Sequence, residues 1–164
     1  RGMDEEGFSG RDGRTTIFDW WSISSVRRLR KLIHSGLYKD LNPSVIRKAG
    51  LNEEEAKTFC RFASLVRFAA SDDAVRKGTT YDLCYCNMSS DGFDKNRHFA
   101  FLRDYKEHTL LIAVNFSDQE ANLKLNIPAH AFEWMGIPVS EALHPGSILD
   151  ISVNPYDGIV KILC

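Results

Sequence analysis

The sequence contains no long hydrophobic run, although 43% of its 164 residues are hydrophobic. No stretch approaches the roughly 20 apolar residues that a membrane-spanning helix needs. It also lacks an excess of either charge, because 21 lysine and arginine residues are balanced by 22 aspartate and glutamate residues. Such a surface does not attract nucleic acid or an anionic membrane over its whole area. We therefore expect a folded chain with neither nucleic acid nor a membrane among its partners.

Cysteine is scarce, with four residues in the whole chain. Four cysteines in a chain of this length do not indicate a disulfide framework. Cys84 and Cys86 are expected to alternate on one strand, where neighbouring thiols rarely meet disulfide geometry. No C-x-x-C pair is present to begin a zinc site. We therefore interpret the cysteines as buried and unreactive thiols, with Cys60 on a helix. Neither a metal nor another cofactor is expected.

Motifs of the common catalytic centres are also missing. The sequence has no G-x-S-x-G elbow and no H-E-x-x-H helix to accompany its five scattered histidines. The evenly spaced glycines within 7–13 lack the G-K-[ST] of a phosphate-binding loop. The three acids of residues 4–6 fit a solvated loop better than a glycosidase carboxylate pair, which must flank one bond on rigid elements. No catalytic residue is predicted.

Three polar features favour plain surface roles. The basic cluster within 27–31 lies opposite apolar positions and fits the solvated face of an amphipathic helix. Segment 91–96 holds calcium-type ligands, but Gly92 is out of register for an EF-hand loop, so a polar loop is favoured. Asn87 and Asn115 begin N-x-S sequons, which have meaning only in a secreted protein. Residues 1–18 show no charged-then-apolar leader, and the compartment is left open.

The strongest pattern is helical and covers Asn52–Ser71, which we call the central helix. Its apolar residues recur at i, i+3, i+4 and i+7, and a second set widens this stripe to more than half of the circumference. The stripe comprises Ala56, Phe59, Cys60, Phe62, Ala63, Leu65, Val66, Ala69 and Ala70. Asn52 and Glu55 resemble a capping box. Because a helix this apolar normally lies between two layers, we expect one of its layers to be missing from the chain.

The rest of the first half is expected to be mostly irregular. Residues 1–22 carry four glycines among charges and predict a long loop. Ser22 or Ser24 then caps a helix that ends near Gly36. Residues 37–51 are expected to be a connector, and a short turn follows between Ser71 and Gly78.

From Thr79 onward the hydrophobic period changes from 3.6 to 2, which predicts strands. The expected strands are Thr79–Cys86, His98–Tyr105, Thr109–Phe116, Ala121–Ile127, Ile148–Val153 and Ile159–Leu163. Residues 106–108 predict a hairpin turn, and the last two strands are expected to pair across 154–158. A helical turn is expected within 128–136, and 137–147 is expected to be irregular. Together these elements predict a small antiparallel sandwich.

An aromatic cluster ends the first loop and is the one candidate binding feature. Phe18, Trp20 and Trp21 follow one another closely, and exposed indole faces stack on the apolar faces of sugar rings. The alternative is that these side chains fill a hydrophobic interface, which is the favoured interpretation for any single one of them. The candidate substrate-binding residues are therefore Phe18, Trp20 and Trp21.

Several stretches together resemble one family. Gly7–Ser22, GFSGRDGRTTIFDWWS, resembles the segment after the eighth strand in α-amylase-type enzymes of glycoside hydrolase family 13. This segment most resembles Bacteroides-like sequences, which usually have tyrosine where this chain has Trp20. The central helix and Ala74–Tyr81 resemble that family's last barrel-side helix and the entry into its C-terminal domain. Phe99–Arg103 and Leu110–Ser117 are similar to strands of that domain.

The resemblance implies a (β/α)8 barrel, with its active site at the C-terminal ends of the strands and a retaining mechanism. The family's catalytic carboxylates would precede Arg1, and no position here matches their motifs. The expected fold class is an α+β fragment: residues 1–77 are the trailing loop and two-helix remnant of a truncated (β/α)8 barrel. Residues 78–164 are expected to be the C-terminal antiparallel β-sandwich domain.

We therefore expect the C-terminal fragment of an α-glucan-acting glycoside hydrolase, structural in the parent enzyme and catalytically silent alone. Its expected partners are the missing catalytic barrel, α-glucan, and a second copy through the exposed helix surface. One alternative is a carbohydrate-binding β-sandwich module, and another is a stand-alone interaction domain unrelated to sugars. The sequence leaves open the linkage preference and the choice between hydrolysis and transglycosylation.

Overall fold

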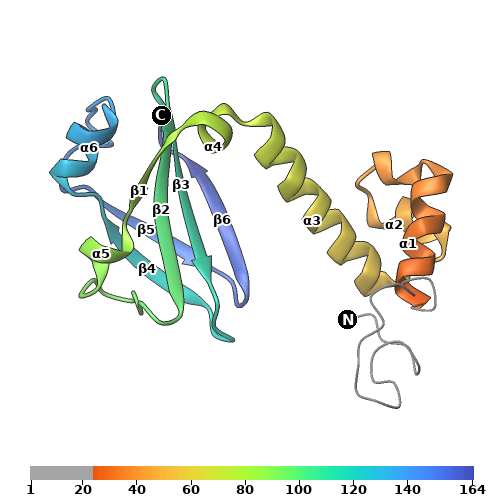
Figure 1. Cartoon of the computed structure of the whole chain (residues 1–164). Coiled ribbons are helices and arrows are strands. Elements are labelled where there is room, and N and C mark those ends of the chain that lie inside the picture. Colours follow the sequence, from red (N-terminus) through yellow and green to blue (C-terminus); the bar gives the residue numbers. More distant parts are fainter. Residues whose placement is uncertain (1–23) are drawn as a thin grey trace, which may run out of the picture. The chain divides into compact units, whose positions relative to one another are not determined.

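The computed structural model describes residues 24–164 and is shown in Figure 1. The chain divides into two compact units, Arg1–Phe68 and Ala69–Cys164, and each is described by itself. Among the described residues, no helix combines the length and hydropathy that crossing a membrane requires.

The first unit is helical. It contains α1 (Ser24–Ser35), η1 (Leu37–Lys39), α2 (Pro43–Ile46), η2 (Arg47–Ala49) and the greater part of α3 (Glu53–Ser71). Its small core consists of Leu32, Ile46, Leu51, Ala56 and Cys60. The expected connector 37–51 is thus a series of short helical turns. Their apolar side chains give α1 and the start of α3 a common core.

The capping box at the start of the central helix is confirmed. The backbone N–H of Glu55 donates to Oδ1 of Asn52 at 2.8 Å, and the N–H of Asn52 donates to Oε2 of Glu55 at 2.9 Å. Two of the N–H groups that a helix start leaves without intrahelical partners are satisfied in this way. The three glutamates of 53–55 also place negative charge in the first turn, where the helix dipole favours it. The sequence therefore defines the start of α3 locally.

The second unit combines two antiparallel sheets with short helices. Its elements are α4 (Asp73–Lys77), β1 (Thr79–Asp82), α5 (Cys84–Asn87), β2 (His98–Tyr105), β3 (His108–Asn115), β4 (Ala121–Asn126), α6 (Ala129–Met135), β5 (Ile148–Val153) and β6 (Asp157–Ile162). One sheet has the order β1-β2-β3-β6, and β4 pairs with β5 in the other. The expected α+β class with antiparallel strands is confirmed, and the barrel remnant remains a prediction.

Alternation along the strands builds the core of this unit. In β2, Ala100 and Leu102 are fully buried, whereas Phe99 is 44% exposed. In β4, Leu123 and Leu125 point into the same core, and Lys124 between them points to solvent. A period of two is the pattern of a strand with one covered face, so these strands were predictable from the sequence.

The expected strand Thr79–Cys86 is wrong in its second half. β1 ends at Asp82, whose Oδ1 accepts the backbone N–H of Cys84 at 2.7 Å. This short side-chain bond turns the chain out of the sheet and into α5. Cys84 and Cys86 therefore lie on a helical turn and not on one face of a strand.

The expected final hairpin is also wrong. β5 pairs with β4, from Ala121 opposite Val153 to Asn126 opposite Ile148, while β6 pairs with β3. The segment 154–156 therefore carries the chain from one sheet to the other. Sequence adjacency favours a hairpin, but the buried faces of β5 and β6 are completed by strands that lie far away in the sequence.

Two fully buried asparagines tie the loops of this unit to its strands. Nδ2 of Asn87 donates to the carbonyl oxygen of Asn126 at 3.0 Å, and its Oδ1 accepts the N–H of Asn126 at 2.7 Å. Asn115 similarly holds the crossover after β5, with Nδ2 3.2 Å from the carbonyl oxygen of Val153. Both begin the sequons noted above, and both are 0% exposed. Neither amide is accessible for glycosylation in the folded chain.

Candidate functional site

The aromatic residues predicted to bind substrate, Phe18, Trp20 and Trp21, lie outside the described residues. The same holds for the acids of 4–6 and the glycines of 7–13. Candidate sites are therefore those formed by residues 24–164.

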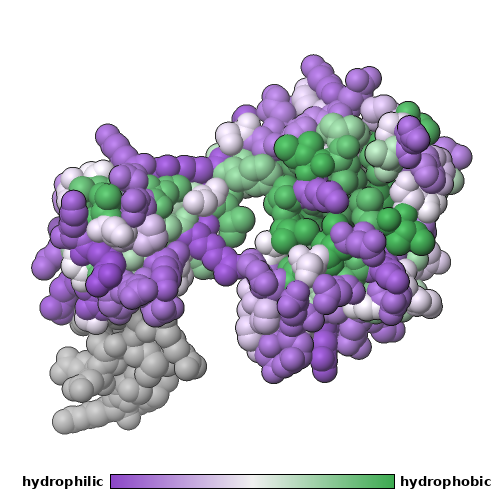
Figure 2. Space-filling model, turned by 180° about the vertical axis from the view of Figure 1, so that it is seen from behind, coloured by the Kyte–Doolittle hydropathy of each residue, from purple (hydrophilic) through white to green (hydrophobic). Residues whose placement is uncertain are grey.

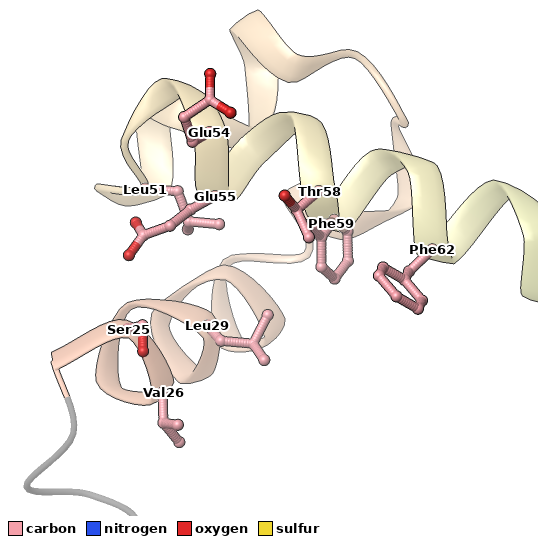
Figure 3. A pocket seen from close by; sticks show the side chains of 9 residues that line it. All are labelled: Ser25, Val26, Leu29, Leu51, Glu54, Glu55, Thr58, Phe59 and Phe62. Carbon is pink, nitrogen blue, oxygen red and sulfur yellow. The ribbon is translucent and has the colours of Figure 1, made fainter. Parts of the chain in front are cut away.

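A groove of about 450 Å³ lies between α1 and α3 in the first unit (Figure 3). Phe59 and Phe62 of α3 point toward α1, from which Leu29 faces them. The complete lining is Ser25, Val26, Leu29, Leu51, Glu54, Glu55, Thr58, Phe59 and Phe62. The i, i+3 spacing of Phe59 and Phe62 places both aromatic rings on the same side of the helix.

One carboxylate at this groove is fixed by an arginine. Nε of Arg28 donates to Oε2 of Glu55 at 2.9 Å, and Nη2 of the same arginine donates to Oε1. These hydrogen bonds lower the pKa of Glu55, and the bond from the Asn52 N–H acts in the same direction. Arg28 belongs to the basic cluster that we interpreted as a solvated helix face. That interpretation is therefore wrong for Arg28, whose side chain joins α1 to the start of α3.

The groove is better suited to packing than to acid/base chemistry. A glycosidase needs one carboxyl group that keeps its proton, whereas Arg28 holds Glu55 ionised. Glu54 points away from α1 in Figure 3, and its side chain is 86% exposed. Among the described residues, no group of three histidine, cysteine, aspartate or glutamate side chains is placed to hold a metal. The groove thus offers an apolar surface with the Arg28–Glu55 ion pair at its margin.

The stripe of α3 continues from Phe62, at the edge of the groove, as exposed apolar surface. Phe62 and Val66 are each 65% exposed and Leu65 is 53% exposed, whereas Ala56 and Cys60 are buried. Phe62, Leu65 and Val66 form what we call the α3 patch. One end of the stripe therefore packs in the first unit's core and the other end presents large side chains to solvent.

A second apolar surface lies on the outer face of the four-stranded sheet. The register places Phe99 beside Val114 and Phe101 beside Ile112, and Ile112 lies beside Val160 of β6 on its other side. We call these five residues the outer-sheet patch, and hydrophobic side chains gather on one face of this unit in Figure 2. α4 covers one end of the face, where Arg103 donates to the carbonyl oxygens of Ala74 and Val75 at 2.9 and 2.6 Å. A sheet covered on one face only would show polar residues here, so the pattern is typical of a sheet with a second contact.

The comparison with known families concerns the region that contains most of both sheets. Residues 93–158 match the family model of the maltogenic amylase C-terminal domain. The match begins in the loop before β2, includes β3, β4, α6 and β5, and ends within β6. It supports the resemblance to the C-terminal domain of α-amylase-type enzymes. No curated protein matches the chain.

The cysteines have different surroundings. Burial raises the pKa values of the Cys60, Cys84 and Cys86 thiols, which disfavours their reactive thiolate forms. Cys164 is exposed, contrary to the expectation of buried thiols. All four are free.

An aromatic site that the sequence analysis missed lies between β1 and α6. His130 contacts both Tyr81 and Trp134, and Trp134 is 64% exposed. The signal that was present is the spacing of His130 and Trp134, which are four residues apart in a predicted helical turn. Tyr81 is distant in sequence and could not be assigned to the same site.

Proposed function

We propose that the chain is the C-terminal part of an α-glucan-acting glycosidase of the α-amylase type, related to Bacteroides-like family 13 enzymes. In this proposal residues 78–164 form its C-terminal sandwich domain, and the preceding helices complete a catalytic barrel supplied by the parent enzyme. The match of residues 93–158 to the maltogenic amylase C-terminal domain carries the proposal. Gly7–Ser22 supports the same assignment independently, because it lies outside the matched region.

The exposed apolar surfaces support a structural role in a larger enzyme. Fully covering a Phe, Leu or Val side chain is worth about 1.5–3 kcal/mol. The three side chains of the α3 patch are each more than half exposed, so a neighbouring layer over them would stabilise the assembly by several kcal/mol. The outer-sheet patch offers a further surface of the same kind. The catalytic barrel is the proposed neighbour.

The proposal assigns catalysis to residues of the parent enzyme and not to this chain. Glu55, the groove carboxylate that is hydrogen-bonded to Arg28, is ionised, so it lacks the proton of a general acid. Phe18, Trp20 and Trp21 are proposed to shape outer sugar subsites of the parent. In the full-length enzyme, Trp20→Ala or Trp21→Ala should weaken the binding of long glucans, and unchanged kinetics would reject this role.

Catalytic silence is tested directly by incubating the purified chain with soluble starch and measuring new reducing ends. No release above the buffer blank is expected, while an α-amylase in parallel confirms that the substrate is competent. Release that Glu55→Gln abolishes would show a reaction centre within the chain and refute this part of the proposal.

A further inference from the structure

The aromatic site on α6 is held by the core of the second unit. Ala131 and Phe132 are buried in the core, so α6 is anchored through its middle. The helix ends at Gly136, whose positive φ of 71° and N–H bond to the carbonyl oxygen of Phe132, 2.9 Å, define the stop. Trp134 lies in the last turn and faces outward. Its indole is thus held in place without being covered.

The neighbouring rings form an ordered set. The rings of His130 and Trp134 are nearly parallel, with an interplanar angle of 19° and centroids 6.2 Å apart. Tyr81 approaches His130 with ring centroids 5.8 Å apart, and its hydroxyl lies 3.3 Å from Nδ1 of His130. Burial raises the pKa of Tyr81, so the phenol keeps its proton at neutral pH. Tyr81 therefore occupies Nδ1 and orients the imidazole.

Two ring nitrogens at this site remain available for a ligand. Tyr81 engages one nitrogen of His130, which leaves Nε2 as the other hydrogen-bonding group of the ring. Trp134 contributes the indole N–H. Neither nitrogen has a hydrogen-bond partner within residues 24–164, so both can bond to a ligand. The site thus presents an open aromatic surface with polar groups at its margin.

We propose that Tyr81, His130 and Trp134 form a carbohydrate-binding platform on the second unit. The C–H groups on one face of a pyranose ring pack on the Trp134 indole, and the ring hydroxyls bond to the nitrogens of His130 and Trp134. A flat apolar surface with a few fixed polar groups is the combination that binds an amphipathic ring and sets its orientation. The choice of α-glucan among sugars rests on the proposed function above. Trp134 binds the chain to its polymer and takes no part in bond cleavage.

Affinity electrophoresis of the 164-residue chain in gels containing soluble starch tests the platform. The wild-type chain should be retarded, and Trp134→Ala should bind about tenfold more weakly, the change expected for one lost aromatic contact. Phe116→Ala is a matched control, because Phe116 is also a 64% exposed aromatic residue but lies after β3. It should migrate as the wild type does. Trp134→Phe keeps a ring and should retain part of the retardation.

Fluorescence provides an independent measurement at the same residue. The chain has three tryptophans, so Trp20→Phe combined with Trp21→Phe leaves Trp134 as the sole indole. Maltohexaose should change its emission saturably, and cellohexaose should not. This variant also removes both tryptophans proposed for the outer subsites of the parent enzyme. A signal from it therefore reports the α6 platform alone.

Three results would contradict the platform or its specificity. Retardation that Trp134→Ala leaves unchanged would refute the platform without affecting the proposed function, which depends on a barrel in the parent. A wild-type chain that starch does not retard, with a constant Trp134 emission, would refute the platform as well. Equal responses to maltohexaose and cellohexaose would retain a sugar platform but refute its α-glucan specificity.

Discussion

Asn115→Ala should destabilise the second unit strongly, because one buried amide holds together three segments. Its Nδ2 lies 2.7 Å from the carbonyl oxygen of Gln119 and 3.2 Å from those of Val153 and Asn154. Its Oδ1 accepts the N–H of Ser117 at 2.9 Å and the hydroxyl of Ser117 at 2.7 Å. These bonds join the end of β3, the turn that follows it, and the crossover after β5.

The expected cost follows from these contacts. An intramolecular hydrogen bond contributes about 1 kcal/mol net, and a buried polar group left without a partner costs about 1–3 kcal/mol. Gln119 and Asn154 are exposed, so their carbonyl oxygens can bond to water in place of the lost Asn115 amide. The carbonyl of the buried Val153 and the N–H of Ser117 are harder to rehydrate. We therefore expect a loss of about 3 kcal/mol in the free energy of unfolding.

Urea unfolding followed by far-UV circular dichroism measures this loss. With an m-value of about 1.5–3 kcal/mol/M, a loss of about 3 kcal/mol lowers the midpoint by about 1–2 M. Asn122→Ala is the control: Asn122 is exposed, and within residues 24–164 its Oδ1 accepts one hydrogen bond, from the Ser152 hydroxyl at 2.8 Å, so the change should stay within about 0.5 kcal/mol. Equal midpoints for Asn115→Ala and Asn122→Ala would refute the assignment of this crossover to a buried amide.

Three further predictions concern the helices. Asp72→Ala should cost about 1–2 kcal/mol at pH 7, because Oδ1 of Asp72 caps α4 and its Oδ2 lies 3.0 Å from Nε2 of His108. Burial alone would raise the pKa of Asp72, but the hydrogen bonds from His108 and the backbone outweigh burial and lower the pKa. In thermal unfolding, wild type should therefore be more stable than Asp72→Ala above about pH 4, and this difference should disappear as the pH falls through the lowered pKa of Asp72. Glu55→Ala should cost the first unit about 1–2 kcal/mol by removing a capping bond and the arginine pair, with Glu54→Ala near zero in the same melts; equal melts would contradict the capping role. Phe62→Asp should reduce concentration-dependent self-association in light scattering. If the variant has the same mass as the wild type at every concentration, the α3 patch is not the contact.

The sequence predicted those features that depend on neighbouring residues. The capping box of Asn52 and Glu55 needs only a spacing of three, and the apolar stripe of the central helix needs only the helical period. The alternation of apolar and polar residues predicted β2 and β5 with the bounds that the structure shows. Lys106 and Glu107, both with positive φ, form the predicted tight turn between β2 and β3.

The features that the sequence did not predict depend on contacts between distant residues. The placement of β5 and β6 in different sheets is decided by their partners β4 and β3, not by the short segment between them. Tyr81 contacts His130 although the two are 49 residues apart in the sequence, so no local pattern predicts the aromatic site. Arg28 similarly meets Glu55 from another helix. The sequence pattern assigned Arg28 to a solvated helix face, because polarity gives no information about which partner a side chain contacts.

The central claim is that this chain completes a glycosidase whose reaction centre lies in a preceding barrel. The most direct test is to sequence the reading frame upstream of Arg1. The account predicts a continuous frame that encodes a (β/α)8 barrel with the nucleophile aspartate and acid/base glutamate of a retaining enzyme. A frame that starts at or just before Arg1, with no barrel encoded ahead of it, would contradict the account.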